Sequence, residues 1–236
     1  MAQSNTAGNL IAFPRTDLRP ILGQAVKRHR LPESLGQALV REAANFPEVT
    51  ADAALAFAIS RRLVATPIDL EMAHGILLVG PSGAGKSAVA EKILHAAQLI
   101  GRACELTRAD GGLALFRTAT HAPECLTVME ADGFNPLNAR AASAFRALGE
   151  IDGVETIGVV SALQDAEDIT DIVTAFRFRR VIVTHLDRTR RLGAALAAFT
   201  SGASLAHVTY GPRPEDGLEV LEPGLLAAQM LEVPAH

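Results

Sequence analysis

The segment with the clearest chemistry is a glycine-rich loop, "GPSGAGKS", at residues 80–87. It fits GxxxxGK[ST] at every fixed position, follows an apolar run and opens a helical stretch. Glycines let the backbone turn its N–H groups toward phosphate oxygens, the lysine neutralises the outer phosphates, and the final serine offers a hydroxyl to Mg²⁺. We predict a phosphate site formed by Gly80, Pro81, Ser82, Gly83, Ala84, Gly85, Lys86 and Ser87.

A second polar group, "THLD" at residues 184–187, follows the apolar run "RRVIV". GTP-binding proteins with such a phosphate loop carry an [NT]KxD element at a comparable strand end. A carboxylate there accepts both the N1–H and the N2 amino group of guanine, a pair that adenine lacks. We expect Asp187 to recognise the base, with Thr184 beside it and His185 in place of the lysine. Taken alone, the segment also fits a strand-end loop followed by a helix N-cap aspartate.

The order of elements predicts an α/β protein, because six β-rich runs alternate with helical stretches after residue 75. Continuous apolar strands separated by helices indicate a mostly parallel sheet that is covered on both faces. Residues 20–64 instead show helical periodicity and predict a small bundle. We expect a flexible arm at 1–18, a helical domain at 19–70 and a nucleotide-binding domain at 71–236. The predicted strands are 75–80, 103–107, 125–130, 154–160, 179–185 and 204–210, and the predicted helices include 86–100, 136–149, 166–178, 190–202 and 222–233.

Three features together resemble the SRP-type, or NG-domain, GTPases: the helical region before the phosphate loop, "THLDRTRRLGAAL" and "VTYGPRPEDGLEV". The last two segments are most similar to the flagellar branch of that family, FlhF. The resemblance covers about residues 20–231. It implies GTP and Mg²⁺ as ligands, with Lys86 as the phosphate lysine, Ser87 as a metal ligand and Gly211 in the loop that closes over the base.

The chain departs from the family pattern in two elements that serve hydrolysis. A DTAGR-like element is replaced by "MEADGFNP", so that Glu130 stands at the metal-orienting position, Asp132 is a nearby second carboxylate, and Phe134 replaces the arginine. The DTYR-like element corresponds to "LTRADGGLALFRTAT". Asp110 stands there for the aspartate, which puts Leu113 at the arginine position, whereas a shifted alignment offers Arg108 as the arginine. A polar turn at the end of a strand also explains the two carboxylates at 130 and 132.

The distance between these two elements is short, because Asp110 and Glu130 are only 20 positions apart. The family carries a longer segment there, with an inserted βαβ unit that builds much of its composite dimer site. Loss of a charge-stabilising arginine lowers phosphoryl-transfer rates by roughly 10³–10⁵. We therefore expect nucleotide binding with slow or absent intrinsic hydrolysis, in which Lys86, Asp110 and Asp132 are the candidate catalytic residues and Ser87 and Glu130 the metal ligands.

Three functions remain open. The first is an FlhF-like switch in flagellar assembly or placement, with GTP and a homologous, self or membrane-associated protein as partners. The second is a degenerate family member that serves as an interaction module. The third is a P-loop ATPase or kinase.

The composition agrees with an ordinary globular protein, with 49% hydrophobic and 20% charged residues. A net charge of −4 argues against a general nucleic-acid binder. We expect a cytoplasmic protein without a secretory signal, which leaves open a peripheral membrane location through a partner. The basic run Lys27, Arg28, His29 and Arg30 is interpreted as a solvated helix end, with contact to anionic lipid or RNA as the alternative.

Overall fold

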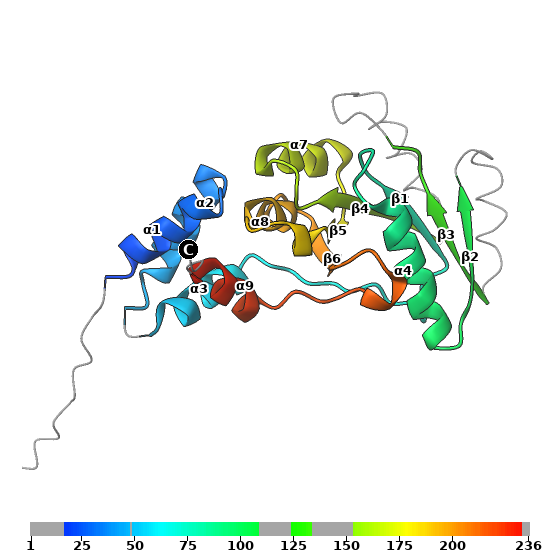
Figure 1. The fold of residues 1–236 in the computed structure, drawn as a ribbon, viewed down its shortest axis with the longest axis horizontal. Helices are drawn as coiled ribbons and strands as arrows, with labels where there is room; N and C mark the ends of the chain where they lie inside the picture. Colours follow the sequence, from blue (N-terminus) through cyan, green and yellow to red (C-terminus); the bar gives the residue numbers. More distant parts are fainter. Residues whose placement is uncertain (1–16, 48, 109–123, 134–152, 233–236) are drawn as a thin grey trace, which may run out of the picture.

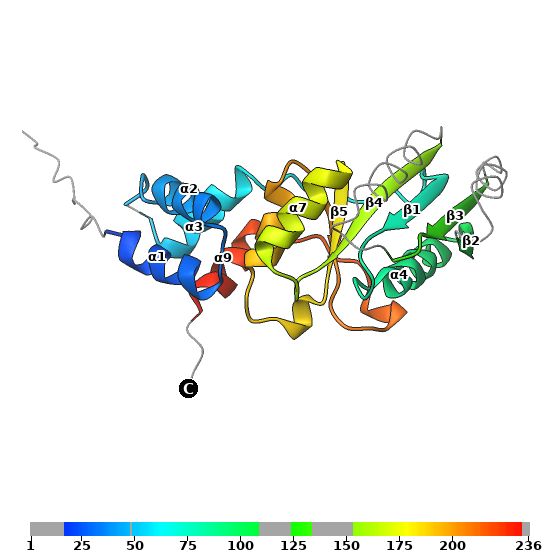
Figure 2. The same ribbon diagram turned by 90° about the horizontal axis from the view of Figure 1, so that it is seen from above.

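The computed structural model describes residues 17–47, 49–108, 124–133 and 153–232. Figure 1 shows a bundle of helices beside an α/β unit, and Figure 2 shows the same two parts from above. The predicted helix at 136–149 and residues 1–16 of the predicted arm lie outside the described residues. The predicted domain boundaries stay predictions.

The sheet contains six parallel strands in the order β2-β3-β1-β4-β5-β6. All six predicted strands are therefore present, and the predicted α/β fold class is confirmed. Because all six strands are parallel, the carboxyl ends of β1, β3 and β5 lie at one edge of the sheet, and the strand order reverses at β1. The strands are β1 (Gly75–Val79), β2 (Ala103–Arg108), β3 (Cys125–Glu130), β4 (Val154–Ser161), β5 (Arg180–Thr184) and β6 (Ser204–Val208).

Helices cover both faces of the sheet, as Figure 1 shows. The helix α4 (Lys86–Leu99) lies on one face, and α7 (Ala166–Phe176) and α8 (Gly193–Thr200) lie on the other. Side chains alternate between the two layers, because successive residues of a strand point to opposite faces. Thus Ile76 and Leu78 pack with α4, whereas Leu77 and Val79 join the core with α7 and α8.

The helical bundle consists of α1 (Arg19–Arg28), α2 (Glu33–Ala43), α3 (Ala51–Ser60) and the last helix, α9 (Pro223–Leu231). Leu22, Leu39 and Leu55 are almost fully buried between these helices and belong to the same core as α8. The final helix thus lies far from its sequence neighbours in the sheet and next to α1 and α3 (Figure 1).

The end of α1 differs from its sequence interpretation. His29 is buried, with Nε2 3.1 Å from the carbonyl oxygen of Met230, and the guanidinium of Arg28 donates to the same oxygen at 2.7 Å. The prediction of a solvated helix end was therefore wrong for these two residues. Their polar groups instead cap α9, because helix ends leave carbonyl groups without partners inside the helix.

The segment that joins the bundle to β1 runs along the outer edge of β6. Thr66 N–H donates to Leu205 O at 2.9 Å, and Ile68 N–H donates to Nε2 of His207 at 3.0 Å. The segment thereby covers an edge strand that would otherwise expose unpaired backbone groups. Within the described ranges, no helix is long and apolar enough to cross a membrane.

Candidate nucleotide site at the carboxyl edge of the sheet

The phosphate loop leaves the end of β1 and leads directly into α4. Gly83 and Gly85 have φ angles of 77° and 91°, in the left-handed region that favours glycine. Gly80 is required for a different reason, because a Cβ atom there would lie 2.2 Å from the carbonyl oxygen of Val159 on β4. The loop is therefore shaped by its backbone and packs closely against the neighbouring strand.

Lys86 lies folded over this loop. Its side chain is 6% exposed, and Nζ donates to the carbonyl oxygens of Gly80 at 3.0 Å and Pro81 at 3.1 Å. Burial lowers the pKa of Lys86, and the carboxylates of Glu130 and Asp132 partly oppose that shift. A desolvated ammonium at the mouth of the loop is suited to pairing with phosphate oxygens, which are stronger acceptors than carbonyl groups.

Ser87, in the first turn of α4, contacts Glu130 at the end of β3. Ser87 Oγ lies 2.8 Å from Oε1 and 3.0 Å from Oε2 of Glu130, which ends β3. A hydroxyl and a carboxylate are hard oxygen ligands, and Mg²⁺ in nucleotide sites is held by one or two such groups plus phosphate oxygens. The residues present thus fit the predicted metal. No cluster of three or more Asp, Glu, His or Cys that could hold a metal ion is found in the described ranges.

Of the other predicted catalytic residues, the structure describes Asp132 but not Asp110. Asp132 is exposed just beyond β3 and lies near enough to Lys86 to influence its pKa. Asp110 and Phe134 lie outside the described residues, so the structure gives no position for the predicted acid at 110. Arg108, the arginine that the shifted alignment offers, ends β2 and pairs with Glu130 in the parallel register.

Gly133 closes the phosphate loop from the β3 side. A Cβ atom at this position would lie 2.2 Å from Ser82 Oγ and 2.9 Å from Ser82 Cα. The segment after β3 and the phosphate loop are therefore in direct contact. A movement of either segment would therefore displace the other.

Thr184 joins the predicted base-recognition segment to the phosphate loop. It is 2% exposed, and its hydroxyl donates to Ala84 O at 2.7 Å. His185 follows in a left-handed conformation with φ 60°, and its Nδ1 lies 2.9 Å from both Thr184 Oγ1 and Ser161 Oγ. Burial, reinforced by Arg188, lowers the pKa of His185. The ring also borders Gly85, where a Cβ atom would lie 3.4 Å from His185 Cε1.

Asp187 lies in the short 3₁₀ helix η2 (Leu186–Arg188) and is exposed at the same edge as the phosphate loop. The N–H of Leu186 donates to Thr209 O at 3.3 Å, so the loop containing Gly211 begins beside this helix. Gly211 has φ 69°, and a Cβ atom there would lie 2.3 Å from Asp216 Oδ2, so glycine is needed where this loop turns. Asp216 in turn accepts the N–H of Arg213 at 2.9 Å, which fixes the short helix η3 (Pro214–Asp216).

Lys92 is a residue of the site that the sequence interpretation missed. It lies on α4, is 1% exposed, and donates from Nζ to the carbonyl oxygen of Arg213 at 2.5 Å. Burial lowers the pKa of Lys92, while Asp216, Glu215 and Asp187 oppose that shift. Its ammonium therefore holds the closing loop through Arg213 and lies near enough to Asp187 for that carboxylate to act on its pKa. No motif in the sequence marks this lysine.

Comparison with known proteins finds no match to a protein-family model or to a curated protein sequence. Solved structures do match. FlhF complexed with GTP and Mg²⁺ has a TM-score of 0.71 at 14% identity, covering 92% of this chain and 100% of that one. The cell division protein FtsY of Thermotoga maritima has a TM-score of 0.68 at 16% identity, covering 92% and 88%. The signal recognition particle 54 kDa protein of Aeropyrum pernix K1, in complex with GDP, has a TM-score of 0.65 at 20% identity, covering 91% and 62%.

At these identities the likeness concerns the fold. The chain has the fold of the SRP-type GTPases, in which a helical bundle precedes a P-loop α/β unit, and the resemblance inferred from sequence is confirmed at that level.

Proposed function

We propose that this chain binds GTP with Mg²⁺ and acts as a nucleotide-dependent switch. The observation that carries the proposal is the convergence of three groups at one edge of the sheet: the phosphate loop after β1, Glu130 at the end of β3, and Asp187 after β5. Ligands of open α/β sheets bind at the carboxyl ends of the strands, where the strand order reverses. The similarity to FlhF structures solved with GTP or GMPPNP and Mg²⁺ supports the choice of ligand.

Different residues of the chain would bind the phosphates, the metal ion and the base. The N–H groups of the phosphate loop and the N-terminus of α4 attract the phosphate oxygens, and Lys86 supplies a positive charge there. Ser87 and Glu130 would hold Mg²⁺, which neutralises phosphate charge when bound. Asp187 accepts two guanine N–H groups, while Lys92 holds the closing loop near the base. Each residue acts on the nucleotide by position and charge, which is how phosphoryl-transfer proteins work.

We propose slow intrinsic hydrolysis. Within the described residues around the phosphate loop, the candidate acids Glu130 and Asp132 are present but no arginine side chain is seen against Lys86 or Ser87. The short connection between residues 110 and 130 further reduces the surface that a composite dimer site would need. Asp110 would serve with Asp132 in positioning water. Turnover would then depend on a partner that supplies the missing charge.

The cellular role that we propose is that of an FlhF-like switch in flagellar assembly or placement, located in the cytoplasm and reaching the membrane through a partner. Support comes from the "RPEDGL" segment and from the match to FlhF over the full length of that chain. A homologous or second copy of the G domain would be its first partner. The second candidate is an interaction module without turnover, and the replacement of the family's arginine by Phe134 favours it.

The test is a titration of the purified chain with fluorescent GTP in Mg²⁺, with unlabelled GTP and ATP as competitors. We expect competition by GTP and loss of binding in Lys86→Ala. Lys27→Ala, which removes an exposed lysine in α1, is the matched control. Competition by ATP alone would reject guanine recognition by Asp187. Absence of any binding would favour the interaction module. Phosphate release under single-turnover conditions then measures hydrolysis.

A further inference from the structure

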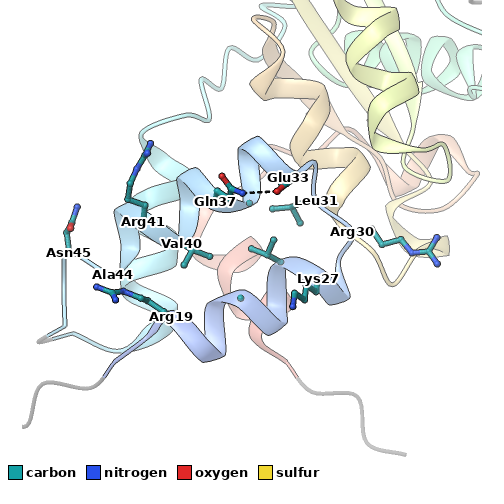
Figure 3. Close-up of a pocket in the computed structure, with 13 residues that line it drawn as sticks. Arg19, Lys27, Arg30, Leu31, Glu33, Gln37, Val40, Arg41, Ala44 and Asn45 are labelled. Carbon is teal, nitrogen blue, oxygen red and sulfur yellow. Dashed lines mark hydrogen bonds between the residues drawn. The ribbon is translucent and has the colours of Figure 1, made fainter.

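A groove of about 790 Å³ lies between α1 and α2, on the helical bundle and away from the nucleotide site. Figure 3 shows Val40 and Leu31 directed into the space between the two helices, with charged side chains around them. The floor is made of apolar and small residues, namely Gly23, Val26, Leu31, Gly36, Val40 and Ala44.

Two glycines give the groove its shape. A Cβ atom at Gly36 would lie 2.3 Å from Val26 Cγ1, so α1 and α2 touch closely at that point. At Gly23 a Cβ atom would meet no atom within 4 Å, so the groove is open there. A glycine inside a helix costs about 1 kcal/mol relative to alanine, and alanine would fit at position 23 without a clash. The floor is therefore open because residue 23 is glycine, although the packing around it would admit a larger residue.

The rim of the groove is positively charged. Arg19 and Lys27 border it from α1, and Arg41 borders it from α2. Arg19 has only an exposed ion pair with Asp17 at 3.9 Å, and no ion pair of Lys27 or Arg41 occurs in the described part of the chain. The one carboxylate of the groove, Glu33, accepts a hydrogen bond from Gln37 at 2.9 Å. Lys27 and Arg41, which have no ion pair among the described residues, are therefore available to bind carboxylates.

We propose that this groove binds an acidic amphipathic helix, of about three turns, from another protein. A helix of that length matches α1, whose 10 residues span about 15 Å. Its apolar stripe would cover Val26, Leu31 and Val40, as amphipathic helices do in hydrophobic grooves. Its flanking carboxylates would face Lys27 on one side and Arg41 on the other, which fixes orientation and speeds association.

Two other occupants fit the groove less well. Residues 1–16 of this chain contain an apolar group at 10–13, but they carry Arg15 and no carboxylate, so their charge has the same sign as the rim. A second copy could offer α7, which is acidic at Glu167, Asp168 and Asp171. However, the apolar residues of α7, such as Ile169 and Ile172, are buried in the core and cannot enter a groove.

The experiment uses the full chain and a designed fluorescent peptide of about 14 residues, with leucines at helical spacing and glutamates on both flanks. A second peptide carries lysines in place of the glutamates. We expect anisotropy to show binding of the acidic peptide only, and weaker binding as salt is raised. Gly23→Trp fills the groove and should weaken binding at least tenfold, whereas the matched Gly23→Ala should retain it. The double variant Lys27→Glu, Arg41→Glu should reverse the preference toward the lysine peptide.

Several outcomes would overturn the proposal. Equal binding of the two peptides, or unchanged binding by Gly23→Trp, would show that the groove is not the site. Tighter peptide binding after the double change Leu10→Asp, Phe13→Asp would show that the chain's own N-terminal residues occupy the groove. Sedimentation that reveals a dimer in the starting protein and a monomer in Gly23→Trp would assign the groove to a second copy. Thermal melting and GTP binding of each variant confirm that the fold is retained.

Discussion

The backbone N–H of Gly193 donates to the carbonyl oxygen of His29 at 3.0 Å, which joins the first turn of α8 to the end of α1. The neighbouring Leu192 N–H donates to His29 Nδ1 at 3.2 Å. These bonds connect the helical bundle to the segment that begins with Asp187. The two parts of the molecule therefore meet through backbone groups that a side chain at position 193 would separate.

Gly193→Ala should destabilise the protein by about 2–4 kcal/mol, because the new Cβ atom would overlap backbone in a well-packed contact. The Cβ atom would lie 2.3 Å from the carbonyl oxygen of Arg30 and 2.5 Å from that of His29, and backbone oxygens cannot rotate away. Urea unfolding measures the change. Gly23→Ala, a helical glycine with open space, is the control and should be neutral or stabilising by up to about 1 kcal/mol. Equal effects of the two variants would contradict the importance of this contact.

Glu130→Gln should weaken GTP binding in Mg²⁺ about tenfold while leaving binding without Mg²⁺ unchanged or slightly improved. The reason is that the carboxylate helps to hold the cation but repels phosphate when the cation is missing. Ser87→Ala removes the hydroxyl that lies 2.8 Å from Glu130 and should show the same dependence on Mg²⁺. Titrations with fluorescent GTP in Mg²⁺ and in EDTA measure both. A loss of the same size under the two conditions would argue against a metal role.

Asp187→Asn should lower affinity for GTP at least tenfold and raise affinity for xanthosine triphosphate. Xanthine carries a carbonyl group where guanine carries its 2-amino group, so an amide can donate where the carboxylate accepted. A site built to hydrogen-bond a polar group discriminates strongly against a ligand that leaves it unpaired. Competition binding with both nucleotides checks the exchange. Asp165→Asn, at the N-cap of α7, is the control and should retain the preference for GTP.

The sequence predicted those parts of the fold that rest on local patterns. The six strands follow from apolar runs such as residues 75–79, and the phosphate loop follows from fixed spacing between Gly80 and Ser87. The end of α1 was misjudged, because burial of His29 depends on Met230, which lies 201 residues away. A contact between residues so far apart in the chain produces no periodic pattern in the sequence.

Lys92 was missed for the same reason. A lysine inside a helix usually extends to solvent, and only the fold brings α4 against the loop that carries Arg213. By contrast, Glu130 could be placed beside Ser87 from sequence, since parallel strands bring their carboxyl ends to one edge.

Lys92→Met should loosen the closing loop and weaken GTP binding several-fold. Methionine keeps most of the buried volume but removes the donor to Arg213 O and the cation opposite Asp216. Removing one partner of a hydrogen bond that involves a charge costs about 1.5–3 kcal/mol. Hydrogen exchange should therefore speed up at residues 211–217 more than in the sheet. Uniform acceleration across the chain would indicate a general loss of stability, and Lys92→Arg should restore part of the protection.

Acidification should destabilise the fold through its buried histidines. Burial is the main cause that lowers the pKa of His29, His185 and His207 below the usual 6.5. The unfolded chain then binds more protons than the folded chain once pH falls through about 6.5, so stability is lost toward lower pH. Each histidine contributes a slope of at most about 1.4 kcal/mol per pH unit.

Urea midpoints between neutral pH and pH about 5 measure this slope, and His207→Gln separates one contribution. His207 Nε2 accepts the N–H of Ile68 at 3.0 Å, and a glutamine oxygen can accept the same hydrogen without gaining a proton. The variant should thus lose less stability on acidification than the starting protein. If the two proteins show the same dependence on pH, His207 does not contribute, and His29 and His185 must account for whatever slope remains.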